Sequence, residues 1–98
     1  MTIREQIHQN ALAIILAANP QITRECDEIS EDGLCGMSLA EFRYLRLTQA
    51  LEKQARSHRL DAWTYQLMLA EGAGIDVSVV RDEDRRATAA ALGVDDLL

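Results

Sequence analysis

The strongest constraint on this chain is a signal for the start of a helix that occurs twice. Thr2 and Ser38 are each followed three residues later by a glutamate, Glu5 and Glu41. In such a capping box the hydroxyl accepts a hydrogen bond from a backbone N–H of the first turn, and the glutamate reaches back to the cap. We therefore predict that one helix begins just after Thr2 and another just after Ser38.

Polar caps also predict the start of three further helices. Asn19 and Pro20 end the first helix and begin a second, because asparagine is a good N-cap and proline is tolerated at the first helical position. Asp61 is expected to cap a short helix over residues 62–71. A last helix, capped by Asp76 or Ser78, is predicted to run to residue 92 and to end at the following glycine.

The apolar residues within these segments recur every three or four positions, as in helices that pack against one another. The predicted inner face of the first helix consists of Ile3, Ile7, Ala11, Ile14 and Ala18. That of the long helix after Ser38 consists of Ala40, Tyr44, Leu47, Leu51, Ala55 and His58. The last helix is expected to turn Val80, Ala87 and Ala91 inward.

Length and composition complete the prediction of the fold. With 98 residues there is room for one domain, which we place at residues 1–98. Aromatic residues make up only 4% of the chain, so small aliphatic side chains must fill the core, as in closely packed helices. The expected fold class is all-α, a small bundle of four to five helices.

The residues that carry chemistry are few and scattered. His8 is expected to face solvent, and His58 to serve as a core or capping residue near the end of the long helix. Cys26 and Cys35 have a spacing that matches no zinc or redox motif, so we expect free thiols. No nucleophile–base pair or phosphate-binding loop is visible, and we predict a protein that is not an enzyme and has no cofactor, metal or catalytic residue.

Charge and hydropathy restrict the partners and the compartment. The net charge of −6 argues against nucleic acid as a partner, because phosphate backbones are bound by clustered lysine and arginine. The apolar run over residues 11–18 is too short to span a bilayer, and it lacks the basic flank of a signal peptide. We expect a cytoplasmic protein without a membrane contact.

One basic face of the long helix is the candidate partner surface. Its members recur at helical spacing on the side opposite Leu47 and Leu51, and they are Phe42, Arg46, Gln49, Lys53 and Arg56. Arginine beside an exposed aromatic residue is typical of the residues that dominate protein interfaces. A solvated face, neutralised by the acidic segment over residues 25–32, is the plainer interpretation of the same pattern.

Several short segments resemble those of a known family. They are the Asn-Pro helix start at position 19, Ser-Leu-Ala-Glu-Phe-Arg-Tyr-Leu-Arg-Leu from position 38, Gln-Ala-Leu-Glu-Lys-Gln-Ala from position 49, Leu-Asp-Ala-Trp from position 60 and Ala-Ala-Leu-Gly from position 90. Together they are similar to a family of short helical bacterial proteins of unknown function, found mainly in pseudomonads. The resemblance implies a fold and a host class, and no activity.

Three hypotheses of function remain open from the sequence. The first is a non-enzymatic protein-interaction or regulatory module that acts through a helix surface on a protein partner, or as a homodimer. The second is a DNA-binding regulator, in which the helices around Ile22 and Arg46 form a helix-turn-helix. The third is an inhibitor of a host protein complex, encoded by a phage or mobile element, since such proteins are often small, acidic and helical.

Overall fold

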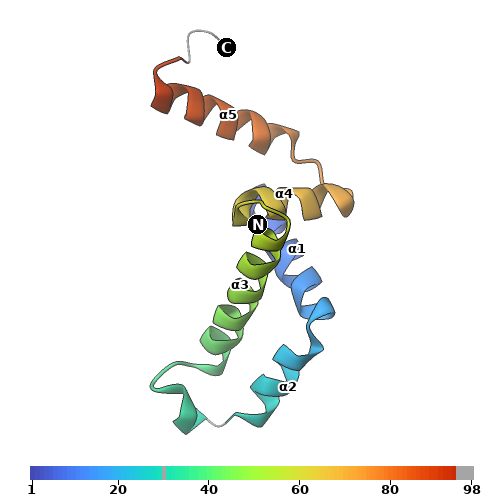
Figure 1. Cartoon of the computed structure of the whole chain (residues 1–98), viewed down its shortest axis with the longest axis vertical. Coiled ribbons are helices and arrows are strands. Elements are labelled where there is room, and N and C mark those ends of the chain that lie inside the picture. The colour runs from blue at the N-terminus through green and yellow to red at the C-terminus, as the bar shows by residue number, and fades with distance from the viewer. Residues whose placement is uncertain (30, 95–98) are drawn as a thin grey trace.

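The computed structural model describes residues 1–29 and 31–94, and in this part of the chain it contains helices and no strand. The five α-helices are α1 (Ile3–Ala18), α2 (Pro20–Glu28), α3 (Leu39–Ser57), α4 (Ala62–Gly72) and α5 (Ser78–Leu92). A 3-10 turn, η1 (Glu31–Leu34), lies between α2 and α3. The prediction of a small all-α bundle is confirmed (Figure 1).

Both predicted capping boxes begin helices through their hydroxyl groups. The backbone N–H of Glu5 donates to Thr2 Oγ1 over 3.1 Å, and that of Glu41 donates to Ser38 Oγ over 3.1 Å. A cap of this kind satisfies one of the N–H groups that the first turn leaves without a partner, and it stabilises a helix by about 1 kcal/mol. The sequence therefore fixes the start of α1 and α3 locally.

The later helix starts differ in part from the expected caps. Asp61 precedes α4, but its carboxylate accepts no capping hydrogen bond. At α5 the N-cap position is Val77, and the Asp76 carboxylate accepts from the backbone N–H of Ser78 at 3.0 Å. Asp76, one residue before the N-cap position, thus supplies the capping hydrogen bond. Gly93 ends α5 in the left-handed conformation, with φ of 73°, as its place after the last helical residue predicts.

Helix α1 forms the centre of the bundle and is covered on two sides. Its first half packs against α4 and its second half against α3, while α2 continues away from α4 after a bend at the end of α1 and lies along α3 (Figure 1). Two apolar clusters result. The larger one joins α1, α2, α3 and α4 around Leu12, Ile22, Leu51 and Tyr65. Burial of each such side chain stabilises the fold by about 1.5–3 kcal/mol.

The second cluster joins α1 and α4 to the start of α5. Its buried members are Ile7, Leu67, Ala70, Val77 and Val80, and the partly buried Ile3, Trp63 and Ile75 pack around them. Ile7 and Val80 are fully buried. This cluster is the apolar attachment of α5 to the rest of the molecule.

The inner faces of three helices differ from the predicted ones. In α1 the buried residues are Ile7, Ala11, Leu12 and Ile15, and the expected Ile14 and Ala18 are exposed because α4 covers only the first half of the helix. In α3 the predicted Leu47, Leu51 and Ala55 are buried, while the expected Ala40, Tyr44 and His58 are exposed beyond the ends of that packing. In α5 Val80 and Ala89 are buried, but the expected Ala87 and Ala91 are exposed.

The molecule is a rod rather than a sphere. Its extents are 55 × 29 × 28 Å and its Cα radius of gyration is 16.7 Å, whereas a compact domain of this length has about 13 Å. The α2–α3 hairpin forms one end, and α5 crosses beyond α4 at the other (Figure 1). Over the described residues, no helix combines the length and the apolar character needed to cross a bilayer.

Candidate functional site

The structure divides the candidate partner surface into two parts. Phe42 is partly buried against the larger core cluster, so it is not the exposed aromatic residue that the sequence predicts. Arg46 is half-buried and binds Glu25 of α2 with two nitrogens: Nε donates to Oε2 at 2.9 Å and Nη2 donates to Oε1 at 3.2 Å. Both side chains face α2, because α2 packs along this side of α3. Phe42 and Arg46 therefore belong to the contact between α2 and α3.

The remaining three members face solvent. Gln49, Lys53 and Arg56 are exposed along α3, and Gln49 accepts a hydrogen bond from Arg46 Nη1 at 3.2 Å. Lys53 borders a shallow hollow of about 230 Å³ between α3 and the α1–α2 elbow, which is also lined by Asn19, Ala50, Gln54 and Ser57. The structure thus leaves a shorter surface than the predicted one, and we call Gln49, Lys53 and Arg56 the basic α3 face.

Half of the lysine and arginine side chains form ion pairs within the chain, and half form none with the described residues. Five arginines form ion pairs, and they are Arg4, Arg46, Arg81, Arg85 and Arg86. Within the described residues the other five cations form none, and they are Arg24, Arg43, Lys53, Arg56 and Arg59. Four of these five lie on α3 or in the turn that follows it. Within the described residues, the cations that form no ion pair are thus concentrated on α3 and the turn after it.

A second polar group joins three helices around His8, and the sequence did not predict it. His8 Nδ1 lies 2.7 Å from Gln66 Oε1, and Nε2 lies 3.0 Å from the Tyr44 hydroxyl. An amide oxygen only accepts, so Nδ1 carries the proton and, in the neutral ring, Nε2 accepts from Tyr44. His8 is part-buried, and the expectation that it faces solvent is wrong. The signal was Gln66, a polar residue between the apolar Tyr65 and Leu67.

In the His8 group the imidazole is held by Gln66 on one side and faces the Tyr44 hydroxyl on the other, as a base faces a hydroxyl nucleophile. Such an order occurs in nucleophilic enzymes, but a reaction also needs a cavity next to the hydroxyl. Tyr44 is 51% exposed on α3, and it does not line the hollows beside Lys53, Cys26 or Arg81. The geometry is that of a brace that ties α1 to α3 and α4.

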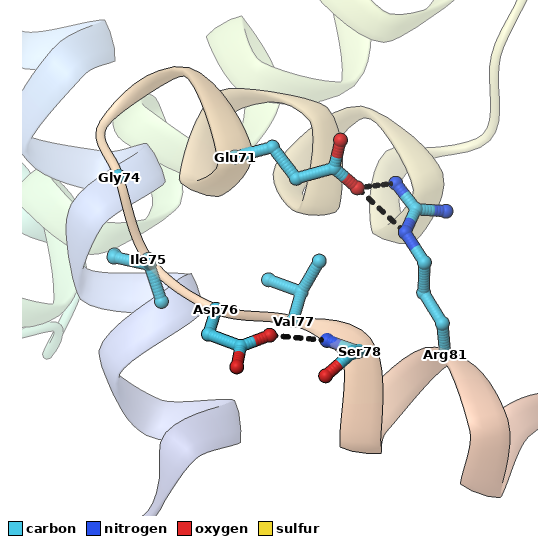
Figure 2. Close-up of a pocket in the computed structure, with 7 residues that line it drawn as sticks. All are labelled: Glu71, Gly74, Ile75, Asp76, Val77, Ser78 and Arg81. Carbon is cyan, nitrogen blue, oxygen red and sulfur yellow. Dashed lines mark hydrogen bonds and ion pairs between the residues drawn. The ribbon is translucent and has the colours of Figure 1, made fainter.

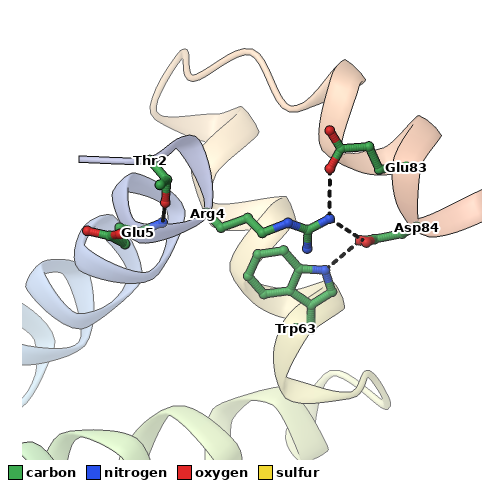
Figure 3. A network of polar contacts seen from close by, with 6 residues as sticks. All are labelled: Thr2, Arg4, Glu5, Trp63, Glu83 and Asp84. Atoms are coloured by element: carbon green, nitrogen blue, oxygen red, sulfur yellow. Dashed lines mark hydrogen bonds and ion pairs between the residues drawn. The ribbon is translucent and has the colours of Figure 1, made fainter. Parts of the chain in front are cut away.

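A third polar group attaches α5 to α1 and α4 (Figure 3). Arg4 Nη2 donates to Asp84 Oδ1 at 2.8 Å and to Glu83 Oε2 at 3.1 Å, and its guanidinium lies over the Trp63 ring at 5.5 Å. Trp63 Nε1 donates to Asp84 Oδ2 at 2.7 Å. The bond from Trp63, followed by that from Arg4, holds the pKa of Asp84 below its usual value. The bonds to Asp84 and Glu83 raise the pKa of Arg4.

The junction of α4 and α5 encloses an open hollow of about 390 Å³ (Figure 2). Two of its charged groups are paired with each other, since Arg81 Nε donates to Glu71 Oε1 at 2.6 Å. The third, the Asp76 carboxylate, accepts from the backbone N–H of Ser78. The backbone N–H of Ser78 lowers the pKa of the Asp76 carboxyl. The contact between Glu71 and Arg81 thus joins α4 to α5 across this hollow.

The cysteines are both free thiols, Cys26 buried and Cys35 exposed. Cys26 borders a hollow of about 300 Å³ between α2 and the start of α3, which is also lined by Thr23, Asp27, Leu39, Ala40 and Arg43. Among the residues that the structure describes, no three histidine, cysteine, aspartate or glutamate side chains are grouped so as to hold a metal ion.

A family model matches residues 1–96, nearly the whole chain. The chain belongs to DUF6388, a family of unknown function. This membership confirms the expectation of a family of unknown function. No curated protein and no solved structure matches the chain.

Proposed function

We propose that this protein is a non-enzymatic interaction module that binds an acidic partner protein through the basic α3 face. The observation that carries the proposal is that some cations of the chain form ion pairs between helices, whereas those of the basic α3 face form none in the described residues. Arg4, Arg46 and Arg81 are each held by carboxylates between helices, whereas Lys53 and Arg56 are exposed and have no carboxylate within ion-pair distance in the described residues.

The electrostatics of such a face favour association with a negatively charged surface. The chain carries a net charge of −6, so a basic face is the region that approaches an acidic partner with least repulsion. Rim charges of this kind raise the association rate and make it sensitive to salt. The neighbouring Gln49, fixed by Arg46, offers a neutral donor and acceptor at the same surface.

A DNA-binding role receives less support from the same contacts. In a helix-turn-helix, α3 would be the recognition helix, yet two of the three guanidinium nitrogens of its Arg46 are bound by Glu25 of the preceding helix. The connection between α2 and α3 spans ten residues and contains η1, whereas the turn of a helix-turn-helix has about three or four. The interaction module is therefore the function that we put forward.

The test compares two variants that lose equal charge. Lys53→Ala/Arg56→Ala removes the exposed cations of the basic α3 face, and Arg24→Ala/Arg43→Ala removes two exposed cations elsewhere. Partner proteins cross-linked to the wild-type chain in its host are identified, and the affinity for each purified partner is measured at two salt concentrations. We expect the first variant to weaken binding by more than about fivefold, with loss of the salt dependence, and the second to bind normally. Equal affinities for both variants and the wild type would contradict the proposal.

A further inference from the structure

The hollow beside Lys53 lies where the bend between α1 and α2 meets the second half of α3. We call it the Lys53 hollow, and its lining residues are Asn19, Ala50, Lys53, Gln54 and Ser57. Ala50 is partly buried against the larger core cluster and has the smallest side chain of the five, so it leaves room above the backbone of α3. The volume of about 230 Å³ is several times the roughly 30 Å³ of one water molecule, and it is sufficient for a short side chain.

Two of the lining residues are held in place by hydrogen bonds within the chain. Asn19 Nδ2 donates to the carbonyl oxygen of Ile15 at 2.7 Å, and Asn19 Oδ1 accepts from Gln21 Nε2 at 3.1 Å. Ser57 Oγ donates to the carbonyl oxygen of Gln54 at 2.7 Å. Asn19 and Ser57 therefore form fixed sides of the hollow.

The other two polar residues of the hollow carry donors without an acceptor. The ammonium group of Lys53 and the amide nitrogen of Gln54 are both donors, and among the described residues none accepts a hydrogen bond from either nitrogen. The amide oxygen of Gln54 lies 3.4 Å from Ser57 Oγ, on the side away from those donors. The α3 side of the hollow thus offers one positive charge and a neutral donor beside it.

The charge of the Lys53 hollow differs from that of the other two hollows. The hollow beside Cys26 includes Asp27, and the hollow beside Arg81 includes Glu71 and Asp76. The five residues that line the Lys53 hollow include one cation and no carboxylate. In a chain with a net charge of −6, this hollow is therefore complementary to an anionic group.

We propose that the Lys53 hollow binds the carboxylate of one glutamate or aspartate side chain of an acidic partner protein. The inference rests on the proposed function and names the group that the partner inserts into the basic α3 face. A carboxylate only accepts hydrogen bonds, and its two oxygens accept from Lys53 and Gln54 together. A phosphate group is excluded by the same count, because phosphate groups are bound by clusters of arginine, and Lys53 is the single cation that lines the hollow.

A neutral pair of substitutions separates this site from the overall charge of the basic α3 face. Gln54→Met keeps the length of the side chain and the net charge, but it removes the amide donor from the hollow. The matched control is Gln9→Met, the same change at an exposed position of α1 that does not line the hollow. Glutamine and methionine have similar helix propensities, so both variants should remain folded, which circular dichroism verifies.

The probe is a short peptide with one glutamate between alanines, compared with the same peptide carrying glutamine or phosphoserine in its place. Each peptide is titrated at constant ionic strength, and the side-chain amide signal of Asn19 is followed by NMR. We expect saturable shifts with the glutamate peptide and none with the glutamine peptide. Gln54→Met should weaken binding of the glutamate peptide by about three- to tenfold, the effect of one hydrogen bond, and Gln9→Met should leave it unchanged.

Three results would overturn the carboxylate site. They are the absence of saturable shifts with the glutamate peptide, equal binding of that peptide by Gln54→Met and Gln9→Met, and tighter binding of the phosphoserine peptide than of the glutamate peptide. The proposed function fails separately, because it concerns the whole partner and the charge of the face. A partner that binds Lys53→Ala/Arg56→Ala weakly but Gln54→Met normally would leave the proposed function in place and overturn the carboxylate site alone.

Discussion

Replacing Val80 with alanine tests how α5 is attached to the rest of the molecule. Val80 is fully buried, and with Val77 it is one of two buried valines that dock this helix. The substitution removes the equivalent of two buried methylene groups, about 1.6 kcal/mol of transfer free energy. The cavity left behind adds to this loss, so we expect a total of about 1.6–2.5 kcal/mol.

The matched control lies at the next position in the sequence. Val79 is 63% exposed, so Val79→Ala makes the same chemical change on the same helix without emptying the core. The free energy of unfolding should then change by less than about 0.5 kcal/mol. A difference between the two variants isolates the burial of Val80 from any effect on helix propensity.

Native-state hydrogen exchange resolves the effect helix by helix. Because Val77 and Val80, at the start of α5, are the residues that join it to an apolar cluster with other helices, α5 should open without the rest of the bundle. A loss of 1.6–2.5 kcal/mol corresponds to about 15–70-fold faster exchange of α5 amides in Val80→Ala, with smaller changes in α3. The attachment that we describe is refuted if all helices accelerate equally, or if Val79→Ala has the same effect as Val80→Ala.

Three further predictions follow from contacts at the surface. Arg46→Ala should lower the free energy of unfolding in urea by about 0.5–1 kcal/mol, because it breaks the two-nitrogen contact with Glu25. Lys53→Ala should change the free energy of unfolding by less than about 0.5 kcal/mol. Equal changes in the two variants would refute the distinction between a paired and an unpaired cation. Asp84 has a lowered pKa in the folded chain, so its contribution is present above the unfolded value of about 3.9 and is lost as the pH falls through the lower folded value. The fluorescence of Trp63, the single tryptophan, should therefore be constant between about pH 7 and 5 and change only below about pH 4, and a change that begins above pH 6 would contradict this. A thiol reagent should modify Cys35 rapidly and Cys26 only on unfolding, and two equally fast thiols would show that α2 does not bury Cys26.

The helix starts could be predicted from the sequence because they depend on neighbours along the chain. Thr2 and Ser38 cap through hydrogen bonds that span three residues, and Gly93 ends α5 by its own backbone conformation. The period of the apolar residues identified the elements and most of the core for the same reason. Residues such as Leu51 and Val80 lie where the pattern places them.

The predictions of buried faces were wrong where a neighbouring helix ends. Ile14 and Ala91 both fit the helical period of their inner faces, yet they are exposed because the helix that would cover them does not extend so far. A periodic pattern carries no information about the length of a neighbouring element. The prediction for α5 was wrong in its second half on this account.

The candidate surface shows the same limit. Phe42 and Arg46 share a helix face with Lys53, but α2 covers only the N-terminal part of that face. The His8 group escaped prediction because its members are separated by 36 and 58 residues, so no local pattern connects them. Its two partners are joined only by the packing of α3 and α4 against α1.

Small-angle X-ray scattering of the wild-type chain, extrapolated to zero concentration, tests most directly whether α5 stands out from the bundle. At that limit the radius of gyration reports the shape of one chain. A value close to 16.7 Å is predicted, because α5 is attached by its first half and projects with the second. A value near 13 Å, that of a compact domain of this length, would mean that α5 folds back onto α3 or α4 and would contradict the account.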